Sequence, residues 1–133
     1  MRNILLIEDD PFLCEMYSSK FKETDFNLLI VKDAKEALKV IKKNKLDLIL
    51  LDIILPGMDG FELLKKIKKD KSISDIPVIF LTNLSQKEDL EKGLKLGAQD
   101  YIIKAYNTPT EVVAKVKSFF DHEKISSNNK KTS

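Results

Sequence analysis

Five short runs of apolar residues recur along the chain, and none of them alternates apolar with polar positions. Unbroken runs of this kind are typical of strands that are covered on both faces, as in a parallel sheet. They predict strands at residues 4–7, 28–31, 48–51, 78–81 and 101–103.

The segments between these runs carry helical start signals. Pro11 follows Asp10 as a first-turn proline after a cap residue. The sequences "DAKE" at 33–36, "SQKE" at 85–88 and "TPTE" at 108–111 have the spacing of capping boxes. The pattern is therefore (βα)5, and right-handed crossovers favour an open, doubly wound α/β sheet with five parallel strands.

The length of 133 residues suits one domain with a proper core. The last helix is expected to end near Asp121, so the predicted domain covers residues 1–122. Residues 123–133 are rich in Ser, Asn and Lys, which predicts a disordered polar tail or the stub of a linker.

Composition narrows the class of protein. The 23 basic and 21 acidic side chains leave a net charge of +2. This small positive excess does not indicate direct nucleic-acid binding. The single cysteine, Cys14, cannot form an internal disulfide and fits a reducing compartment. No segment reads as a signal peptide or a membrane span, so we expect a cytoplasmic protein without membrane insertion.

Polar residues stand directly after four of the five predicted strands. In open α/β sheets, ligands bind beyond the carboxyl ends of the strands, so these residues should share one rim. They are Glu8, Asp9 and Asp10 after the first run, Asp52 after the third, Thr82 after the fourth and Lys104 after the fifth.

These residue types together indicate a site for a divalent cation and a phosphoryl group. Carboxylates brought together repel one another unless a cation joins them, and an all-oxygen cluster suits Mg²⁺ or Mn²⁺. Asp52, in the middle of the set, would be the nucleophile that forms an aspartyl phosphate. Thr82 and Lys104 would hold the other phosphoryl oxygens, since phosphoryl transfer needs positioning and charge neutralisation above all.

Four segments make the chain recognisable: "ILLIEDDPFL", "LILLDIILPGMDGFELL", "VIFLTN" and "GAQDYIIK". In this order and spacing, the chain resembles the receiver domain of two-component response regulators over residues 1 to about 122. The resemblance implies a flavodoxin-like strand order 2-1-3-4-5 with helices on both faces. Because 133 residues hold no output domain, we expect a stand-alone, chemotaxis-receiver-like switch that works by binding; a piece of a longer regulator would have the same sequence.

The resemblance assigns the acidic residues. It implies that Asp52 is the phosphoacceptor and that Asp9 is a direct Mg²⁺ ligand. Glu8 would act largely through metal-bound water, and the backbone carbonyl of Ile54 would complete the protein ligands. Asp10 falls outside the usual acidic pair, and we interpret it as a helix cap.

The resemblance also implies how the signal spreads. Thr82 would bond the acyl phosphate and move toward it, which lets Tyr101 turn inward, while Lys104 would pair with a phosphate oxygen. The phosphoryl group would come from a histidine kinase or a phosphotransfer protein, and the target would be an unknown downstream protein. Such a domain catalyses only its own phosphorylation and slow dephosphorylation.

The sequence departs from the family pattern beside the site. Ala105 follows the lysine where proline in a cis peptide is usual, and we expect a cis bond here only if the pocket enforces it. Asn83 stands where a very small residue is usual. Ile54 and Leu84, two places beyond Asp52 and Thr82, are large and apolar, so we expect them to hinder an attacking water and prolong the phosphorylated state.

Two other functions fit parts of the pattern. A phosphohydrolase of the haloacid dehalogenase type also uses an aspartate after a strand, but it needs a second acid two residues on, where this chain has Ile54. The chain is also too short for a substrate cap. A phosphate-independent pseudo-receiver, acting only as an interaction module, is disfavoured by the complete acidic set.

Overall fold

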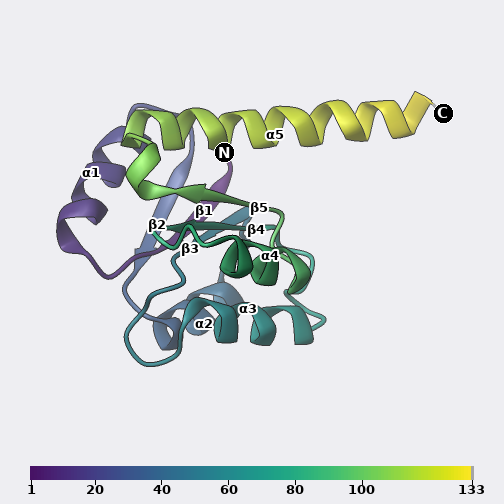
Figure 1. Ribbon diagram of the computed structural model, residues 1–133. Helices are drawn as coiled ribbons and strands as arrows, with labels where there is room; N and C mark the ends of the chain where they lie inside the picture. The colour runs from purple at the N-terminus through teal and green to yellow at the C-terminus, as the bar shows by residue number, and fades with distance from the viewer. Residues whose placement is uncertain (133) are drawn as a thin grey trace.

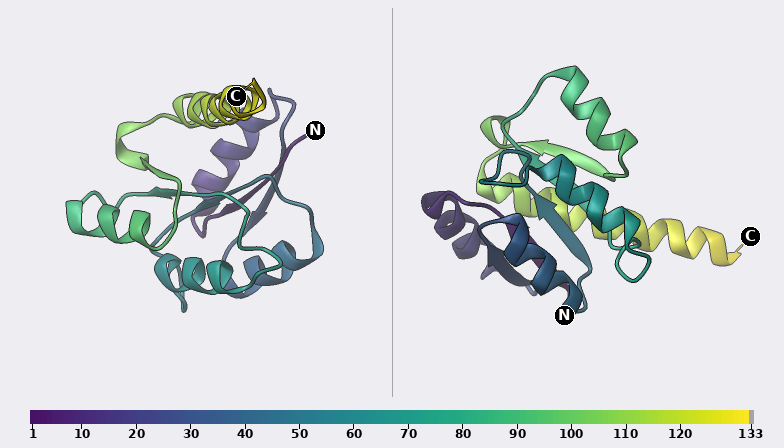
Figure 2. Two further views of the ribbon diagram at one scale, coloured as in Figure 1. Left: turned by 90° about the vertical axis from the view of Figure 1, so that its right-hand side faces the viewer. Right: turned by 90° about the horizontal axis from the view of Figure 1, so that it is seen from below.

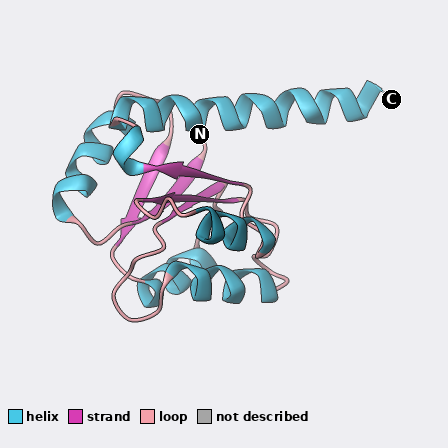
Figure 3. Cartoon of the chain, viewed as in Figure 1, coloured by secondary structure: helices cyan, strands magenta, loops and turns pink. Residues whose placement is uncertain are grey.

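A computed structural model of the chain describes the backbone of residues 1–132 and the side chains of residues 1–122. Five parallel strands form one sheet in the order β2-β1-β3-β4-β5, which confirms the predicted doubly wound fold (Figures 1 and 3). The strands are β1 (Asn3–Ile7), β2 (Asn27–Val31), β3 (Leu48–Leu51), β4 (Val78–Thr82) and β5 (Asp100–Ile103). The helices are α1 (Pro11–Phe21), α2 (Ala34–Lys43), α3 (Gly60–Lys69), α4 (Lys87–Lys95) and α5 (Pro109–Thr132).

The sheet is covered on both faces. Helices α1 and α5 lie on one face, and α2, α3 and α4 lie on the other (Figure 2). In β3, Leu48 and Leu50 point into the core under α1 and α5, while Ile49 and Leu51 point into the core under the opposite helices. All four are fully buried, which explains why this strand has no polar position.

Most helices begin as the sequence predicts. Asp10 accepts hydrogen bonds from the backbone N–H groups of Phe12 and Leu13, so it is the cap of α1. Asp33 caps α2 through the N–H of Glu36. At the start of α5, Thr108 and Glu111 bond each other's backbone N–H groups, as a capping box requires.

The predicted capping box at 85–88 is wrong. Helix α4 begins later, with Gln86 as its N-cap, and no side chain bonds the N–H groups of its first turn. The carbonyl of Gln86 accepts the first helical bonds, from the N–H groups of Asp89 and Leu90. Ser85 therefore lies one residue outside the helix, where it cannot serve as the cap.

The predicted end of the last helix is also wrong. Helix α5 continues past Asp121 to Thr132, and Figure 1 shows it extending beyond the sheet. No proline or glycine occurs between residues 110 and 132, so nothing in the local sequence breaks the helical backbone. The division of the chain at residue 122 stays a prediction.

Candidate functional site

The register of the sheet brings the acidic residues together. Ile7 pairs with Leu51, so the next residues of the two neighbouring strands, Glu8 and Asp52, leave the sheet side by side. On the other side of β3, Thr82 pairs with Ile103. Lys104 therefore emerges one residue beyond Thr82, at the same rim.

Lys104 is the centre of a buried ion-pair network. Its Nζ donates to Oδ2 of Asp52 at 2.6 Å and to Oε2 of Glu8. The three side chains are almost enclosed, with exposed fractions of 7% for the lysine, 8% for Asp52 and 2% for Glu8. Removing one partner of such a network leaves an uncompensated buried charge, which costs several kcal/mol.

Burial sets the charge balance of this network. It raises the pKa of Glu8, because desolvation of the carboxylate outweighs the attraction of Lys104. Burial alone would lower the pKa of Lys104, yet the hydrogen bonds and charges of Asp52 and Glu8 together raise it. The lysine is therefore firmly cationic, while the surroundings of Glu8 still favour additional positive charge.

The acidic residues fit a divalent cation. Glu8, Asp9 and Asp52 each offer a carboxylate oxygen, and these oxygens lie within 4.8 Å of one another. Three carboxylates against the single ammonium of Lys104 leave two negative charges when all four groups are ionised. Hard oxygen donors around such a charge suit Mg²⁺ or Mn²⁺. Asp10 is not in this cluster, since its side chain caps α1.

The loop after Asp52 folds tightly against the site. Oδ1 of Asp52 accepts a hydrogen bond from the N–H of Ile54 at 3.3 Å, and Asp59 caps α3. A Cβ atom on Gly60 would lie 2.4 Å from the carbonyl oxygen of Asp52, so only glycine permits this approach. Gly57 adopts a φ of 76°, which the turn requires.

Thr82 and Tyr101 lie where the sequence predicts. Thr82 is fully buried, and its Oγ1 accepts from the N–H of Leu84 at 3.2 Å, which leaves the hydroxyl hydrogen free to donate. Tyr101 is half-buried and packs against the core under α2 and α3. Asn83 is exposed. The switch roles of Thr82 and Tyr101 and the carbonyl of Ile54 as a ligand stay predictions.

The loop after Lys104 contains no cis peptide bond, nor does any other described residue. A single 3-10 turn, η1 (Lys104–Tyr106), follows β5 instead. Asn107 closes this turn, because its side chain donates to the carbonyl of Ile103 and its backbone N–H to the carbonyl of Lys104. With Ala105 in place of proline, the lysine still reaches both carboxylates.

Cys14, the single cysteine of the sequence, is half-buried beside the site, and Tyr17 on the same helix was not singled out from the sequence. Sγ of Cys14 donates to the carbonyl oxygen of Glu8 at 3.3 Å. Burial raises the pKa of this thiol, and the negative charge of Glu8 raises it further, so the thiolate is disfavoured. Tyr17 lies three residues later on the same helix and is 2% exposed. Spacing along α1 was the available signal, since positions three apart share a helix face.

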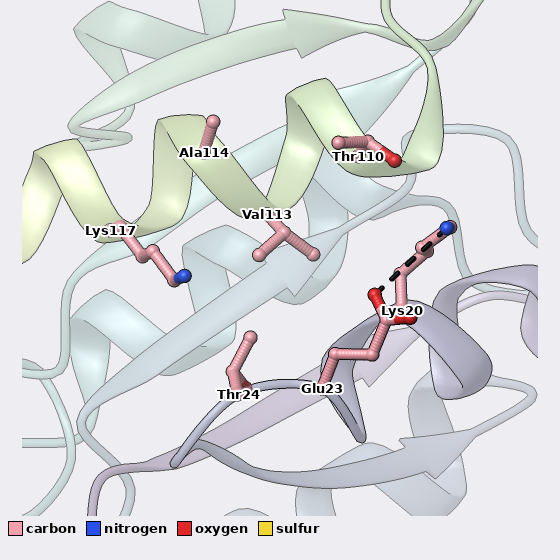
Figure 4. Close-up of a pocket in the computed structure, with 7 residues that line it drawn as sticks. All are labelled: Lys20, Glu23, Thr24, Thr110, Val113, Ala114 and Lys117. Carbon is pink, nitrogen blue, oxygen red and sulfur yellow. Dashed lines mark ion pairs between the residues drawn. The ribbon is translucent and has the colours of Figure 1, made fainter.

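A pocket lies between α1 and α5, apart from the acidic cluster. Figure 4 shows Val113 in its centre, with Lys117 on one side and the ion pair of Lys20 and Glu23 on the other. The pocket holds about 290 Å³, and the ion pair is 3.9 Å long. This pair is largely exposed and is worth little in water. The polar residues of the rim, Glu8, Asp52, Thr82 and Lys104, do not line this pocket.

The chain belongs to the response regulator receiver domain family, whose sequence model matches residues 4–117. A probable transcriptional regulator of Porphyra purpurea, ycf29, is 36% identical over 129 residues, which are 97% of this chain and 61% of that protein. The phosphate regulon regulatory protein PhoB of Pseudomonas aeruginosa is 37% identical over 88% of this chain and 51% of its own. The chain therefore spans only about half to three fifths of these relatives.

Solved structures agree with this assignment. The Mn²⁺-bound form of the response regulator Rcp1 is 28% identical and superposes with a TM-score of 0.81, covering 90% of this chain and 94% of that one. Proteins of this family are signalling proteins rather than enzymes with an external substrate. Among the described residues, no helix combines the length and the apolar character that a membrane crossing needs.

Proposed function

We propose that this domain is a signalling switch that accepts a phosphoryl group on Asp52 and then changes its partner-binding surface. The observation that carries the proposal is the position of the Asp52 carboxylate. It is nearly buried, bonded to Lys104 through one oxygen, and grouped with the carboxylates of Glu8 and Asp9. Membership in the receiver family supports the same role.

The transfer is a displacement at phosphorus. An oxygen of Asp52 forms the new P–O bond while the P–N bond of a phosphohistidine donor breaks, and the imidazole nitrogen leaves with the electron pair. Lys104 pairs with a phosphoryl oxygen and the hydroxyl of Thr82 donates to another, so both neutralise charge that the transfer brings in. A Mg²⁺ or Mn²⁺ ion bound by Glu8, Asp9, Asp52 and the carbonyl of Ile54 would neutralise the rest.

The signal then leaves through the surface around α4, β5 and α5. The aspartyl phosphate adds further negative charge to a crowded site, which is enough to bias a two-state element. Movement of Thr82 toward the phosphate would let Tyr101 turn inward. The donor would be a histidine kinase or phosphotransfer protein and the target a downstream protein in the cytoplasm, with no direct nucleic-acid contact by this domain.

Phosphorylation with a small-molecule donor tests the proposal. We expect the wild type to incorporate label when incubated with acetyl phosphate and Mg²⁺, and to incorporate far less when the cation is chelated. Asp52→Asn should incorporate none, whereas Asp25→Asn, an exposed acid in the loop between α1 and β2, should behave as wild type. Incorporation that persists in Asp52→Asn would contradict the proposal. Steady turnover of an ordinary phosphate ester would favour a phosphohydrolase instead.

The residues beside the site also predict a long-lived phosphoryl group. Ile54 is 60% exposed and Leu84 is half-buried, and neither apolar side chain offers a polar group to orient an attacking water. We expect Ile54→Asn to shorten the half-life of the label several-fold without changing the site of labelling. Rapid loss of label from the wild type would refute this part of the proposal.

A further inference from the structure

The turn after β5 carries Lys104 into the site with little support from packing. Lys104 is the first residue of η1, which joins β5 to α5. Ile103, just before it, is buried, but Ala105 and Tyr106 are both exposed. Alanine also leaves the φ angle of the backbone free, whereas proline would fix it. Another interaction must therefore hold the backbone of the lysine.

Asn107 bonds the backbone on both sides of the lysine. Its Nδ2 donates to the carbonyl oxygen of Ile103 at 2.9 Å, and its backbone N–H donates to the carbonyl oxygen of Lys104 at 3.3 Å. These two carbonyls belong to the peptide groups that precede and follow the Cα atom of the lysine. Among the described side chains, no other bonds the backbone of residues 103–107.

Asn107 is itself attached to the rigid start of α5. The next residue, Thr108, forms the capping box with Glu111. The carbonyl oxygen of Thr108 accepts from the N–H of Val112 at 2.9 Å, and Val112 is fully buried in the core under α5. The side chain of Asn107 therefore connects the turn that carries the lysine to a helix start that is capped and packed.

Phosphoryl transfer changes the side-chain partners of the lysine but not these backbone bonds. Nζ of Lys104 bonds Oδ2 of Asp52 at 2.6 Å, and this oxygen belongs to a carboxylate that loses its charge when it becomes an acyl phosphate. The ammonium then has to meet a phosphoryl oxygen at the end of a flexible four-carbon stem. The bonds of Asn107 involve none of the reacting groups, so the transfer leaves them intact.

We propose that Asn107 is a positioning residue, which holds the backbone of Lys104 so that the ammonium reaches the phosphoryl group on Asp52. The inference rests on the proposed function, since it concerns the transfer to Asp52. Asn107 bonds neither the phosphoryl group nor Asp52 and acts through the lysine alone.

Removing the amide tests the inference. Asn107→Ala should lower the rate of labelling by acetyl phosphate and Mg²⁺ about tenfold, because transfer depends steeply on the placement of the groups around the phosphorus. The matched control is Asn44→Ala. Asn44 also donates from Nδ2 to the carbonyl four residues earlier, that of Val40, at the same 2.9 Å, but it lies at the end of α2. Asn44→Ala should label like wild type, and equal rates for Asn107→Ala and wild type would overturn the inference.

A second substitution separates the hydrogen bond from the shape of the side chain. Asn107→Asp keeps the shape but replaces the N–H donor with an oxygen that cannot donate to the carbonyl of Ile103 when ionised. It should therefore label at least as slowly as Asn107→Ala. A wild-type rate in Asn107→Asp would show that the donated bond is not needed and would refute the inference.

A double-mutant cycle separates positioning from a general effect on the fold. If Asn107 acts through the lysine, Asn107→Ala should lose its effect on the labelling rate in a Lys104→Met background. A tenfold loss that persists in that background would show that Asn107 acts without the lysine, against the inference. A wild type that takes no label on Asp52 would instead refute the proposed function, so the two failures are distinguishable.

Discussion

The loops after β1 and β3 are held more firmly than the loop after β4. Asp10 bonds two N–H groups at the start of α1, and Asp59 bonds one at the start of α3. Gly60 is pressed against the backbone of Asp52. By contrast, α4 has no side-chain cap, is only nine residues long and contains Gly93. The carboxylates are thus fixed in place, while Thr82 precedes the least supported helix.

This difference suits a switch. Ligands for a cation and a phosphoryl group must be held in position before they bind, whereas a conformational change needs an element with low local stability. The same sheet provides both, because β1 and β3 lead to capped helix starts, whereas β4 leads into the uncapped α4 segment. Four predictions test the comparison, beginning with the largest effect.

The close contact between Gly60 and Asp52 should contribute most to the stability of the firmly held loops after β1 and β3. Gly60→Ala would push a Cβ to 2.4 Å from the carbonyl oxygen of Asp52, and the atom it meets is backbone. We expect a loss of about 3 kcal/mol in the free energy of unfolding. Gly57→Ala is the matched control: it has open space but a φ of 76°, so it should cost only about 1 kcal/mol. Urea denaturation measures both, and equal losses would show that the approach is not rigid.

A bound divalent cation should further stabilise the loops after β1 and β3, which carry the carboxylates. With free Mg²⁺ at about 100 times its dissociation constant, the free energy of unfolding should rise by about 2.7 kcal/mol. Asp9→Asn should abolish this rise without destabilising the cation-free protein, because Asp9 is exposed and its carboxylate lies near two others. Asp10→Asn is the control, since asparagine also caps helices. A Mg²⁺ effect that survives in Asp9→Asn would place the cation elsewhere.

Close packing against Phe80 should explain why α4 keeps a glycine at position 93, a residue that lowers the stability of a helix. A Cβ there would lie 2.6 Å from a ring carbon of Phe80. Alanine normally stabilises a helix interior by about 1 kcal/mol over glycine, but here we expect Gly93→Ala to destabilise by about 1–2 kcal/mol. In a Phe80→Leu background, the same change should become stabilising. If Gly93→Ala destabilises equally in both backgrounds, the ring of Phe80 is not what requires glycine.

The sequence was sufficient for the fold and for the residues at the rim. Runs without polar positions identified all five strands, and the first residues after them gave Glu8, Asp52, Thr82 and Lys104. What it could not give depends on contacts between distant segments. The pairing of Lys104 with Glu8 and the fit of Gly60 against Asp52 both arise from packing.

Local signals failed for two helix ends, for opposite reasons. At residues 85–88 a good capping pattern is present, but the chain leaves β4 in a loop that places Ser85 outside the helix. After Asp121 the composition is polar and predicts a tail, yet a chain without proline or glycine can continue as a helix. Capping patterns and composition therefore predict helix ends poorly where tertiary contacts fix the start of a helix, or where no residue breaks the helix at its end.

The smallest effect concerns the missing cap of α4, and it tests whether weakness there is functional. Gln86→Ser should supply the absent side-chain acceptor and stabilise the protein by about 0.5–1 kcal/mol. Lys87→Ser, the same residue placed one position inside the helix, should give no such gain. Hydrogen exchange of the α4 amides should slow in Gln86→Ser only.

A firmer α4 should also respond less to phosphorylation. If movement of Thr82 is transmitted through the α4 segment, labelling Asp52 should change hydrogen exchange in α4 less in Gln86→Ser than in wild type, while the labelling rate stays the same. The reason is that a cap on α4 stabilises the resting arrangement without touching the groups that transfer the phosphoryl group. An equal exchange response in both proteins would mean that α4 moves as a rigid body, so its weak start would have no part in the switch.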